Sequence, residues 1–196
     1  MRCGMGFQPV VRCNSFAILM CQDWQVHAAL PDFGCRKPVI QRDLMVTLRD
    51  LTRDNWVECV RLTLGENQQG NLASNIETIA ESKFADHHRL RAIYLGDRLV
   101  GLLAYTHEDD PTDEKLFWIF RLMVDKNYQR QGIGRAAMQL AIAEIAELGA
   151  SRIRTMHKPT NRAAASLYRS IGFREIGFLD DGDVLLEMRL TATQDQ

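Results

Sequence analysis

The 196-residue sequence predicts an α/β (α+β) domain in which a mixed, largely antiparallel sheet carries helices on both faces. Two sharp turns, at Gly96-Asp97 and at the run DDGD (180–183), each separate two strand-like runs and so indicate antiparallel hairpins. An apolar run at 115–124 precedes an amphipathic helix at 132–148, which is the pattern of a buried central strand covered by a helix. The expected order of elements is β-α-α-β-β-β-α-β-α-β-β.

The strands are expected where apolar and polar residues alternate, or where a short apolar run lies between turn residues. Val46 and Leu48, for example, alternate with polar neighbours as in a half-buried strand. The expected strands are 45–51, two within 91–108, 115–124, 151–156, 173–179 and 184–190.

Capping residues and periodicity predict the two helices that follow the first strand. Thr52 is expected to be the N-cap of the first, and Ser74 with Glu77 forms a capping box for the second, because each side chain can satisfy a free backbone N–H. The apolar faces expected for these helices consist of Trp56, Val57, Val60 and Leu64 in the first, and of Ile76, Ile79, Ala80 and Phe84 in the second.

Two later helices have clearer ends. Gly149 is expected to be the C-cap of the helix at 132–148, and Asn161 is expected to cap a helix at 162–171 that Gly172 ends. The buried face expected for the helix at 132–148 carries Met138, Ala141, Ile142, Ile145 and Leu148.

We assign one domain to residues 45–190, since the chain is long enough for a single full core. Residues 1–44 show no sustained period and are interrupted by glycine and proline. They are expected to be a disordered extension, or the product of translation begun upstream of a true start at Met45, with a targeting leader as the alternative. Residues 191–196 are expected to form a tail.

Composition indicates that the binding specificity of this protein depends on local groups of residues and not on its overall charge. A net charge of −1 and a pI near 6.5 give no overall field toward nucleic acid or an anionic membrane. No apolar run approaches the roughly 20 residues of a membrane-spanning helix, so we expect a cytoplasmic protein. Four of the five cysteines fall in the first 35 residues without a CxxC pair or histidines at zinc-finger spacing, which predicts unpaired thiols and no metal site.

A glycine loop joins the central strand to the long helix. The first N–H groups of a helix lack partners and carry the positive end of the helix dipole, so this junction suits a phosphate. Gly132 and Gly134 remove side chains that would block the approach of a ligand, and Arg130 and Arg135 add positive charge. The loop therefore predicts an anion site.

Two other kinds of phosphate-binding loop fit this sequence less well. Gly132 to Ala137 also fits G-x-G-x-x-A, the dinucleotide fingerprint, but that motif belongs in a first βαβ unit with an acidic residue about 20 positions later. Here the loop comes late in the chain, and the end of the next strand, RIRTMHKP, has no Asp or Glu. A Walker sequence, G-x-x-x-x-G-K-[ST], does not occur in the chain.

Two motifs resemble the GNAT superfamily of acyl-CoA N-acyltransferases. The residues from Gln129 to Gly134 resemble its signature Q/R-x-x-G-x-G/A, and those from Asn161 to Phe173 resemble its second block, N-x-x-A-x-x-x-Y-x-x-x-G-F, at the expected distance downstream. The element order agrees over about residues 45–190. The resemblance implies the GNAT fold and an N-acetyltransferase that uses acetyl-CoA by direct attack in a ternary complex, without a covalent enzyme intermediate.

The resemblance also implies roles for individual residues. Leu122, Met123 and Val124 would bind the pantetheine arm, because in that family this strand splays from its neighbour, and Asn161 would contact the coenzyme. The residues implied for the coenzyme phosphates are Gln129, Arg130, Gln131, Gly132, Ile133, Gly134 and Arg135.

Proton transfer is assigned to two side chains. Tyr168 lies two helical turns after Asn161 and faces the same way, and the resemblance makes it the acid that protonates the departing thiolate; a core tyrosine is the alternative. A base is needed because an alkyl ammonium with a pKa near 10.4 is only about one part in a thousand neutral at pH 7. His157 is the candidate, although a lone strand histidine is more often structural.

The acceptor is the least determined part. The stretches RDNWVECVRLTLGENQQGNLASNIETIAESKF and FWIFRLMVDKNYQRQGIGRAAM resemble the bacterial spermine/spermidine N-acetyltransferase branch, which implies a polyamine acceptor near Glu66, Asn67 and Asn75. Acidic runs at 107–114 and 180–183 would suit a cationic substrate, or would be solvated hairpin ends.

Other functions stay open at this point. The acceptor of an acetyltransferase of this kind can also be an aminoglycoside, an amino acid or a protein N-terminus, and a non-catalytic acyl-CoA sensor would keep the same loop. In this superfamily the C-terminal hairpin strands often pair across a dimer, so the resemblance makes a homodimer a further expectation.

Overall fold

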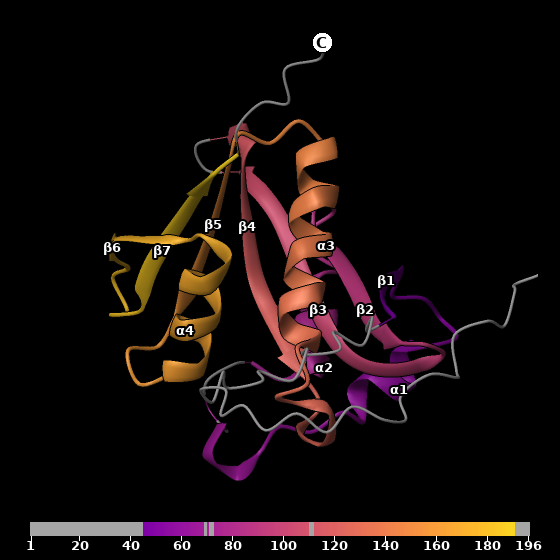
Figure 1. Ribbon diagram of the computed structural model, residues 1–196. Helices are drawn as coiled ribbons and strands as arrows, with labels where there is room; N and C mark the ends of the chain where they lie inside the picture. The colour runs from indigo at the N-terminus through magenta and orange to yellow at the C-terminus, as the bar shows by residue number, and fades with distance from the viewer. Residues whose placement is uncertain (1–44, 69, 71–72, 110–111, 191–196) are drawn as a thin grey trace, which may run out of the picture. The chain divides into compact units, whose positions relative to one another are not determined.

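The computed structural model describes residues 45–190 except 69, 71–72 and 110–111 (Figure 1). The predictions for residues 1–44 and for the tail at 191–196 lie outside the described residues. Among the described residues no helix is long and apolar enough to cross a membrane.

The elements follow one another in the predicted order. The strands are β1 Val46–Asp50, β2 Arg89–Leu95, β3 Arg98–Asp109, β4 Thr112–Val124, β5 Arg152–His157, β6 Arg174–Phe178 and β7 Val184–Arg189. The helices are α1 Trp56–Val60, α2 Asn75–Glu81, α3 Ile133–Glu147 and α4 Arg162–Ile171, with 3₁₀ turns η1 Glu66–Gln68 and η2 Lys126–Tyr128.

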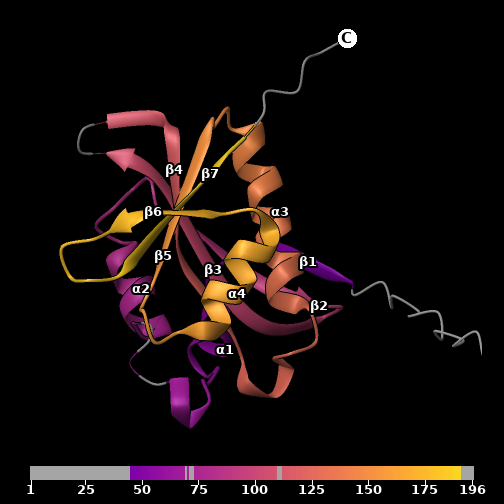
Figure 2. The same cartoon turned by 60° about the vertical axis from the view of Figure 1, so that its left-hand side comes forward.

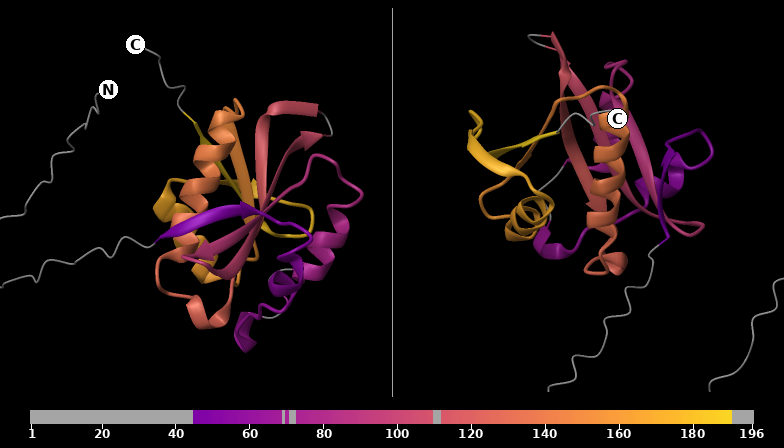
Figure 3. Two further views of the ribbon diagram at one scale, coloured as in Figure 1. Left: turned by 90° about the vertical axis from the view of Figure 1, so that its right-hand side faces the viewer. Right: turned by 45° about the horizontal axis from the view of Figure 1, so that its top comes forward.

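The strands form one mixed sheet in the order β1-β2-β3-β4-β5-β7-β6. Of the pairs described, β4 with β5 is parallel and the others are antiparallel. Helices α3 and α4 lie on one face of the sheet and α1 and α2 on the other (Figure 3), and α4 lies beside α3 (Figure 1 and Figure 2). The predicted fold class is therefore confirmed.

The larger core lies between α3 and the sheet. Ala137, Met138, Ala141 and Ile145 are fully buried there, as the 3.6-residue period predicts for one face of this helix. Leu148 is 55% exposed, and its expected burial was wrong, because it follows the last residue of the helix, Glu147, and lies past the edge of the core. The expected C-cap is likewise displaced by one residue: Leu148 is the C-cap, and the left-handed glycine follows it.

The prediction for α1 was wrong in its cap and in its face. The N-cap is Asn55, and Thr52 belongs to the preceding turn, where its backbone N–H donates to Asn55 Oδ1 at 2.7 Å. Trp56 and Val57 are 45% and 40% exposed, because this single-turn helix points Cys59 into the sheet instead. One turn is too short for a 3.6-residue pattern to fix which face is buried.

The capping box of α2 is confirmed, but of the apolar face predicted for this helix only Ile79 packs against the core. Ser74 Oγ accepts from the Glu77 N–H at 3.2 Å, and the Glu77 carboxylate accepts from the Ser74 N–H at 2.6 Å. The buried residues are polar, Asn75 and Thr78, whereas Ile76 is 59% exposed. The face expected to be apolar also included Ala80, which is exposed, and Phe84, which lies beyond the helix end.

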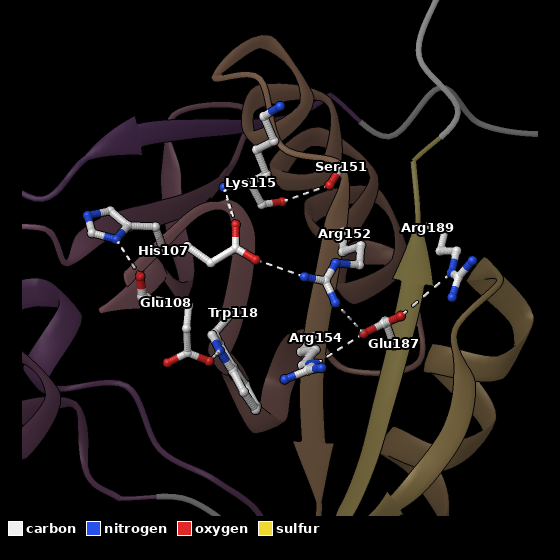
Figure 4. Close-up of polar contacts among 10 residues, drawn as sticks. His107, Glu108, Lys115, Trp118, Ser151, Arg152, Arg154, Glu187 and Arg189 are labelled. Atoms are coloured by element: carbon white, nitrogen blue, oxygen red, sulfur yellow. Dashed lines mark hydrogen bonds and ion pairs between the residues drawn. The ribbon is translucent and has the colours of Figure 1, made fainter. Parts of the chain in front are cut away.

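The parallel pair of strands is joined along a short seam only. Residues Leu116–Trp118 of β4 pair with Arg152–Arg154 of β5, and no further ladder pair joins these two strands. Ion pairs reinforce the seam: Arg152 lies 2.8 Å from Asp113 and 3.8 Å from Glu187 (Figure 4). The two strands are thus fastened at the start of β4 and are free to separate toward its end.

Candidate active site

A cavity of about 620 Å³ opens where β4 and β5 separate. Thr155 Oγ1 donates to the Ile119 carbonyl at 2.9 Å and makes the last direct contact between the strands before the gap. The cavity is lined by the later part of β4, the end of β5, the glycine loop and α4. The glycine loop and the segment from Asn161 to Tyr168 are therefore brought to one site, although they lie apart in the sequence.

The loop after β4 exposes backbone N–H groups. Arg130 has a φ of 59° and Gly132 a φ of 85°, so two left-handed residues curl the chain just before α3. Gly132 is the N-cap of α3, and no side chain caps this end of the helix. Such a curl of amides at a helix start is an anion-binding arrangement.

Most of the predicted site residues line this cavity. From the loop these are Gln129, Arg130, Gly132, Gly134 and Arg135. From β4, β5 and α4 they are Leu122, Val124, His157, Asn161 and Tyr168.

Four predicted site residues do not line the cavity. Met123 is buried on the other face of the sheet, because side chains alternate along a strand, and Ile133 is buried in the core beneath α3. Gln131 and Glu66 are exposed to solvent. The prediction gave continuous runs of residues to one ligand, whereas successive side chains of a strand point to opposite faces of the sheet.

The two asparagines expected near the acceptor are placed differently. Asn75 is buried, and its Nδ2 donates to the Cys59 carbonyl at 2.8 Å, so its amide holds α2 against α1. The side chain of Asn67 lies outside the described residues.

Tyr168 presents a protonated hydroxyl group to the cavity. Its side chain is 7% exposed, and burial raises the pKa of the phenol above its usual value, while a hydrogen bond with the Thr155 hydroxyl acts in the opposite direction. Asn161 caps α4 by accepting from the Ala164 N–H at 3.1 Å, which fixes the start of the helix that carries Tyr168.

His157 has one ring nitrogen engaged and one available. Nδ1 lies 2.9 Å from the Lys158 carbonyl, and because a carbonyl only accepts, the proton of the neutral ring belongs on Nδ1. Nε2 then carries a lone pair; it is shielded from solvent and has no hydrogen-bond partner among the described residues. The ring lies 6.3 Å from that of Tyr168.

Several residues that line the cavity were missed from the sequence. Gln68 of η1 accepts from Gln129 Nε2 at 2.8 Å, a contact across 61 positions that no local pattern reveals. Thr155 and Arg121 line the cavity from β5 and β4. Alternation along the strands does not identify them, because a bulge precedes Arg121 in β4 and Thr155 lies on the same face of β5 as the buried Ile153.

The two acidic runs lie in different surroundings. In the region where β4 pairs with β5, Glu108 accepts from Trp118 Nε1 at 2.8 Å and Asp113 forms an ion pair with Arg152 (Figure 4). These carboxylates have structural partners and lie away from the cavity. Asp183, from the turn between β6 and β7, is the carboxylate that lines the cavity in the described part of the chain.

Comparison with known proteins agrees with this geometry. The model of the acetyltransferase (GNAT) family matches residues 47–173. The spermine/spermidine N(1)-acetyltransferase of Bacillus subtilis (strain 168) is 26% identical over 141 residues, which cover 70% of this chain and 93% of that protein.

Two solved structures share the fold. The spermidine N-acetyltransferase from Vibrio cholerae, in complex with CoA and spermine, aligns with a TM-score of 0.61 at 18% identity, over 74% of this chain and 95% of that one. The ribosomal-protein-S18-alanine N-acetyltransferase from Escherichia coli aligns with a TM-score of 0.58 at 20% identity, over 78% and 99%. At these identities the likeness is one of fold alone.

The family match covers more than half of the chain, and it spans the splayed strands, the glycine loop and α4. The chain therefore belongs to the GNAT acetyltransferase family, as an N-acetyltransferase that takes its acetyl group from acetyl-CoA and acts on an amine.

Proposed function

We propose that the amine attacks the acetyl thioester directly, in a ternary complex held in the cavity between β4 and β5. The observation that carries this proposal is that one cavity joins the amide-rich loop, the open side of β4 and the hydroxyl group of Tyr168. A linear thioester bound with its phosphates at the loop and its arm along β4 would end beside Tyr168.

The loop residues are proposed to hold the coenzyme phosphates. The amides around Gly132 and Gly134 and the start of α3 would donate to the pyrophosphate oxygens. Arg130 is exposed beside them, and Arg135 is tied to α4 by a hydrogen bond from Nη1 to the Ser170 carbonyl at 3.1 Å. Leu122 and Val124 would contact the arm.

Tyr168 is proposed to be the general acid. As the amine nitrogen bonds to the carbonyl carbon, the carbon–sulfur bond breaks, and the thiolate would take the proton of the Tyr168 hydroxyl group. The raised pKa keeps this proton in place at neutral pH, before the thiolate forms.

His157 is proposed to accept the proton of the amine, directly or through a water molecule. Its Nε2 lone pair is held in the site by the contact of Nδ1 with the Lys158 carbonyl. The role is needed because the acceptor amine is almost fully protonated at pH 7.

A polyamine such as spermidine or spermine is the starting hypothesis for the acceptor. It is supported by the name of the Bacillus relative and by Asp183, which could face an ammonium group. Glu66 remains a weaker candidate, since it is exposed on the loop beside cavity residue Gln68. The cytoplasmic location and the homodimer stay predictions.

The test is a panel of amines supplied with acetyl-CoA while free coenzyme thiol is measured. The panel contains spermidine, spermine, an aminoglycoside, amino acids and a peptide with a free N-terminus. Release of thiol that depends on the amine, with the acetylated amine identified by mass spectrometry, is the expected result. Coenzyme binding with no thiol release for any amine would leave a sensor as the function, and binding of NADH in place of coenzyme A would overturn the family-based mechanism.

A further inference from the structure

Arg121 brings a cationic side chain to the cavity beyond the proposed arm site. It directly precedes Leu122 in β4, on the side away from the glycine loop, and it lines the cavity in a half-buried position. A thioester whose arm lies along Leu122 and Val124 would place its reacting carbonyl near this residue. The charge of Arg121 therefore acts where the acceptor must bind.

A β-bulge turns Arg121 toward this position. Opposite β3, Tyr105 pairs with Ile119 and Ala104 with Arg121, so Phe120 is the extra residue. In a regular strand Arg121 would lie on the same face as Ile119, which is buried in the core beneath α3. The extra residue turns the Arg121 side chain to the opposite face of the sheet, where it reaches Thr78 of α2. Bulges that redirect a side chain in this way are frequent beside functional sites.

The guanidinium group is anchored but keeps donors available. Nε donates to Thr78 Oγ1 at 2.9 Å, and Nη1 donates to the Phe120 carbonyl at 3.2 Å. A guanidinium has five N–H donors, so the rest lie on its two terminal nitrogens. Among the described residues no carboxylate forms an ion pair with Arg121.

We propose that Arg121 is a specificity-determining residue that selects, among primary amines, an acceptor that also carries a carboxylate, as an amino acid or a small peptide does. A carboxylate would take the remaining donors in charge-assisted hydrogen bonds, which are stronger than the electrostatic interaction that Arg121 has with Glu77 of α2. A second ammonium group at the same place, as in a polyamine, would be repelled. Asp183, on the turn between β6 and β7, offers the opposite charge for the amine.

This inference rests on the proposed direct attack and replaces the polyamine as the acceptor, and it is tested with matched acceptors. Amino acids such as alanine, glutamate and lysine are compared with their carboxamides, and with spermidine, in the thiol-release assay on the full chain. The amine of a carboxamide is less basic than that of the acid, so a larger part of it is neutral and reactive. A kcat/KM for the acid that is roughly tenfold or more above that of its amide would therefore report recognition of the carboxylate.

Variants of Arg121 separate recognition from structure. Arg121→Glu should lower kcat/KM for the acids by roughly 10- to 100-fold and shift the preference toward amides and spermidine, mainly through KM. Arg121→Lys should keep a preference for acids, and Arg121→Gln, which retains a donor for Thr78, should abolish the preference without reversing it. Arg53→Glu makes the same change of charge at an exposed position outside the cavity and should leave the ratio as in the wild type.

The outcomes are distinct. If the wild type uses amides or spermidine as well as the acids, or if Arg121→Glu slows acids and amides equally, Arg121 only fastens α2 to β4; the inference is then wrong and the proposed function stands. If no amine of either kind releases thiol, the proposed function fails and this inference fails with it.

Discussion

At the scale of single residues, Gly132 and Gly134 occupy the same loop for different reasons. Gly132 has a φ of 85°, which side chains with a Cβ rarely adopt. Gly134 has no such constraint, and a Cβ placed on it would meet nothing closer than Leu167 Cδ2 at 3.7 Å, an ordinary contact. Packing therefore leaves the absence of a side chain at Gly134 unexplained, whereas a ligand that approaches the helix start explains it.

The variant Gly134→Ala should separate folding from coenzyme binding. Alanine is a better helix former than glycine by about 0.5–1 kcal/mol, so the melting temperature should stay constant or rise. The new methyl group should weaken coenzyme A binding by tenfold or more, as measured by calorimetry. Gly132→Ala is the contrasting variant, because its left-handed backbone should cost about 1–2 kcal/mol of stability. Unchanged affinity in Gly134→Ala would contradict a phosphate site at this loop.

Tyr168→Phe tests the proposed acid. The ring contacts, such as that with Phe173 at a centroid distance of 5.9 Å, are retained, so the fold and the affinity for coenzyme A should change little. The value of kcat should fall roughly 100-fold or more, as for the loss of a general acid. A variant with the wild-type rate would show that the tyrosine serves packing alone.

The raised pKa of Tyr168 also fixes the sign of a pH effect. The hydroxyl group must be protonated to act as an acid, and its folded pKa lies above the ordinary value of 10.0. The high-pH loss of kcat due to this group should therefore begin only above about pH 10. Its contribution to stability follows the same direction: it is complete below the unfolded pKa and is lost as the pH rises through the folded one. A loss of kcat near pH 8 that disappears in Tyr168→Phe would contradict this assignment.

At the scale of elements, Asp125 connects the loop after α1 with the end of β4. Its carboxylate accepts from the Thr63 N–H at 2.8 Å and from the Asn127 N–H at 3.0 Å, and the Thr63 carbonyl accepts from the Lys126 N–H at 2.9 Å. Burial acts to raise the pKa of Asp125, but these hydrogen bonds outweigh burial and lower it.

Asp125→Asn should therefore destabilise the fold in a pH-dependent way. The amide group would turn a donor toward either Thr63 or Asn127, which should cost about 1–3 kcal/mol of unfolding free energy at pH 7. Because the folded pKa of Asp125 is lowered, its contribution is present above the ordinary value of 3.8 and is lost as the pH falls through the folded pKa. The difference between wild type and variant, measured by urea unfolding, should narrow below about pH 4; a constant difference down to pH 2 would contradict this.

The elements also show what the sequence could and could not predict. Long or well-capped elements such as β4, α3 and α4 were placed within a few residues, because burial on one face dictates their pattern. The buried faces of α1 and α2 were mostly not predicted, because the buried residues of these short helices are Cys59, Asn75 and Thr78, and Ile79 is the predicted apolar residue that packs against the core. Contacts such as Gln68 with Gln129 depend on how distant loops meet, which no local pattern contains.

At the scale of the whole molecule, the direct attack that we propose agrees with the position of the cysteine that the structure describes. Cys59 is the cysteine in the described part of the chain; it is fully buried in the smaller core between α1 and the sheet, outside the cavity. Burial, assisted by the charge of Glu58, raises the pKa of its thiol to about 12, so its thiolate form is negligible at neutral pH.

Initial rates measured over a grid of acetyl-CoA and amine concentrations should therefore give intersecting lines in double-reciprocal plots. Such a pattern indicates that both substrates bind before any product leaves. Parallel lines would indicate an acetylated enzyme and would contradict direct attack.

The short seam between β4 and β5 leaves the sheet with an edge in its interior. Exposed strand edges invite other polypeptides to add a strand, and proteins usually protect them with charges, bulges or covering loops. Here the unpaired side of β4 beyond Trp118 faces the cavity, whose other walls are the end of β5, the glycine loop and α4. A ligand that lies in the cavity would meet the backbone groups on this side of β4, so the interior edge of the sheet would be covered by a ligand in place of a strand.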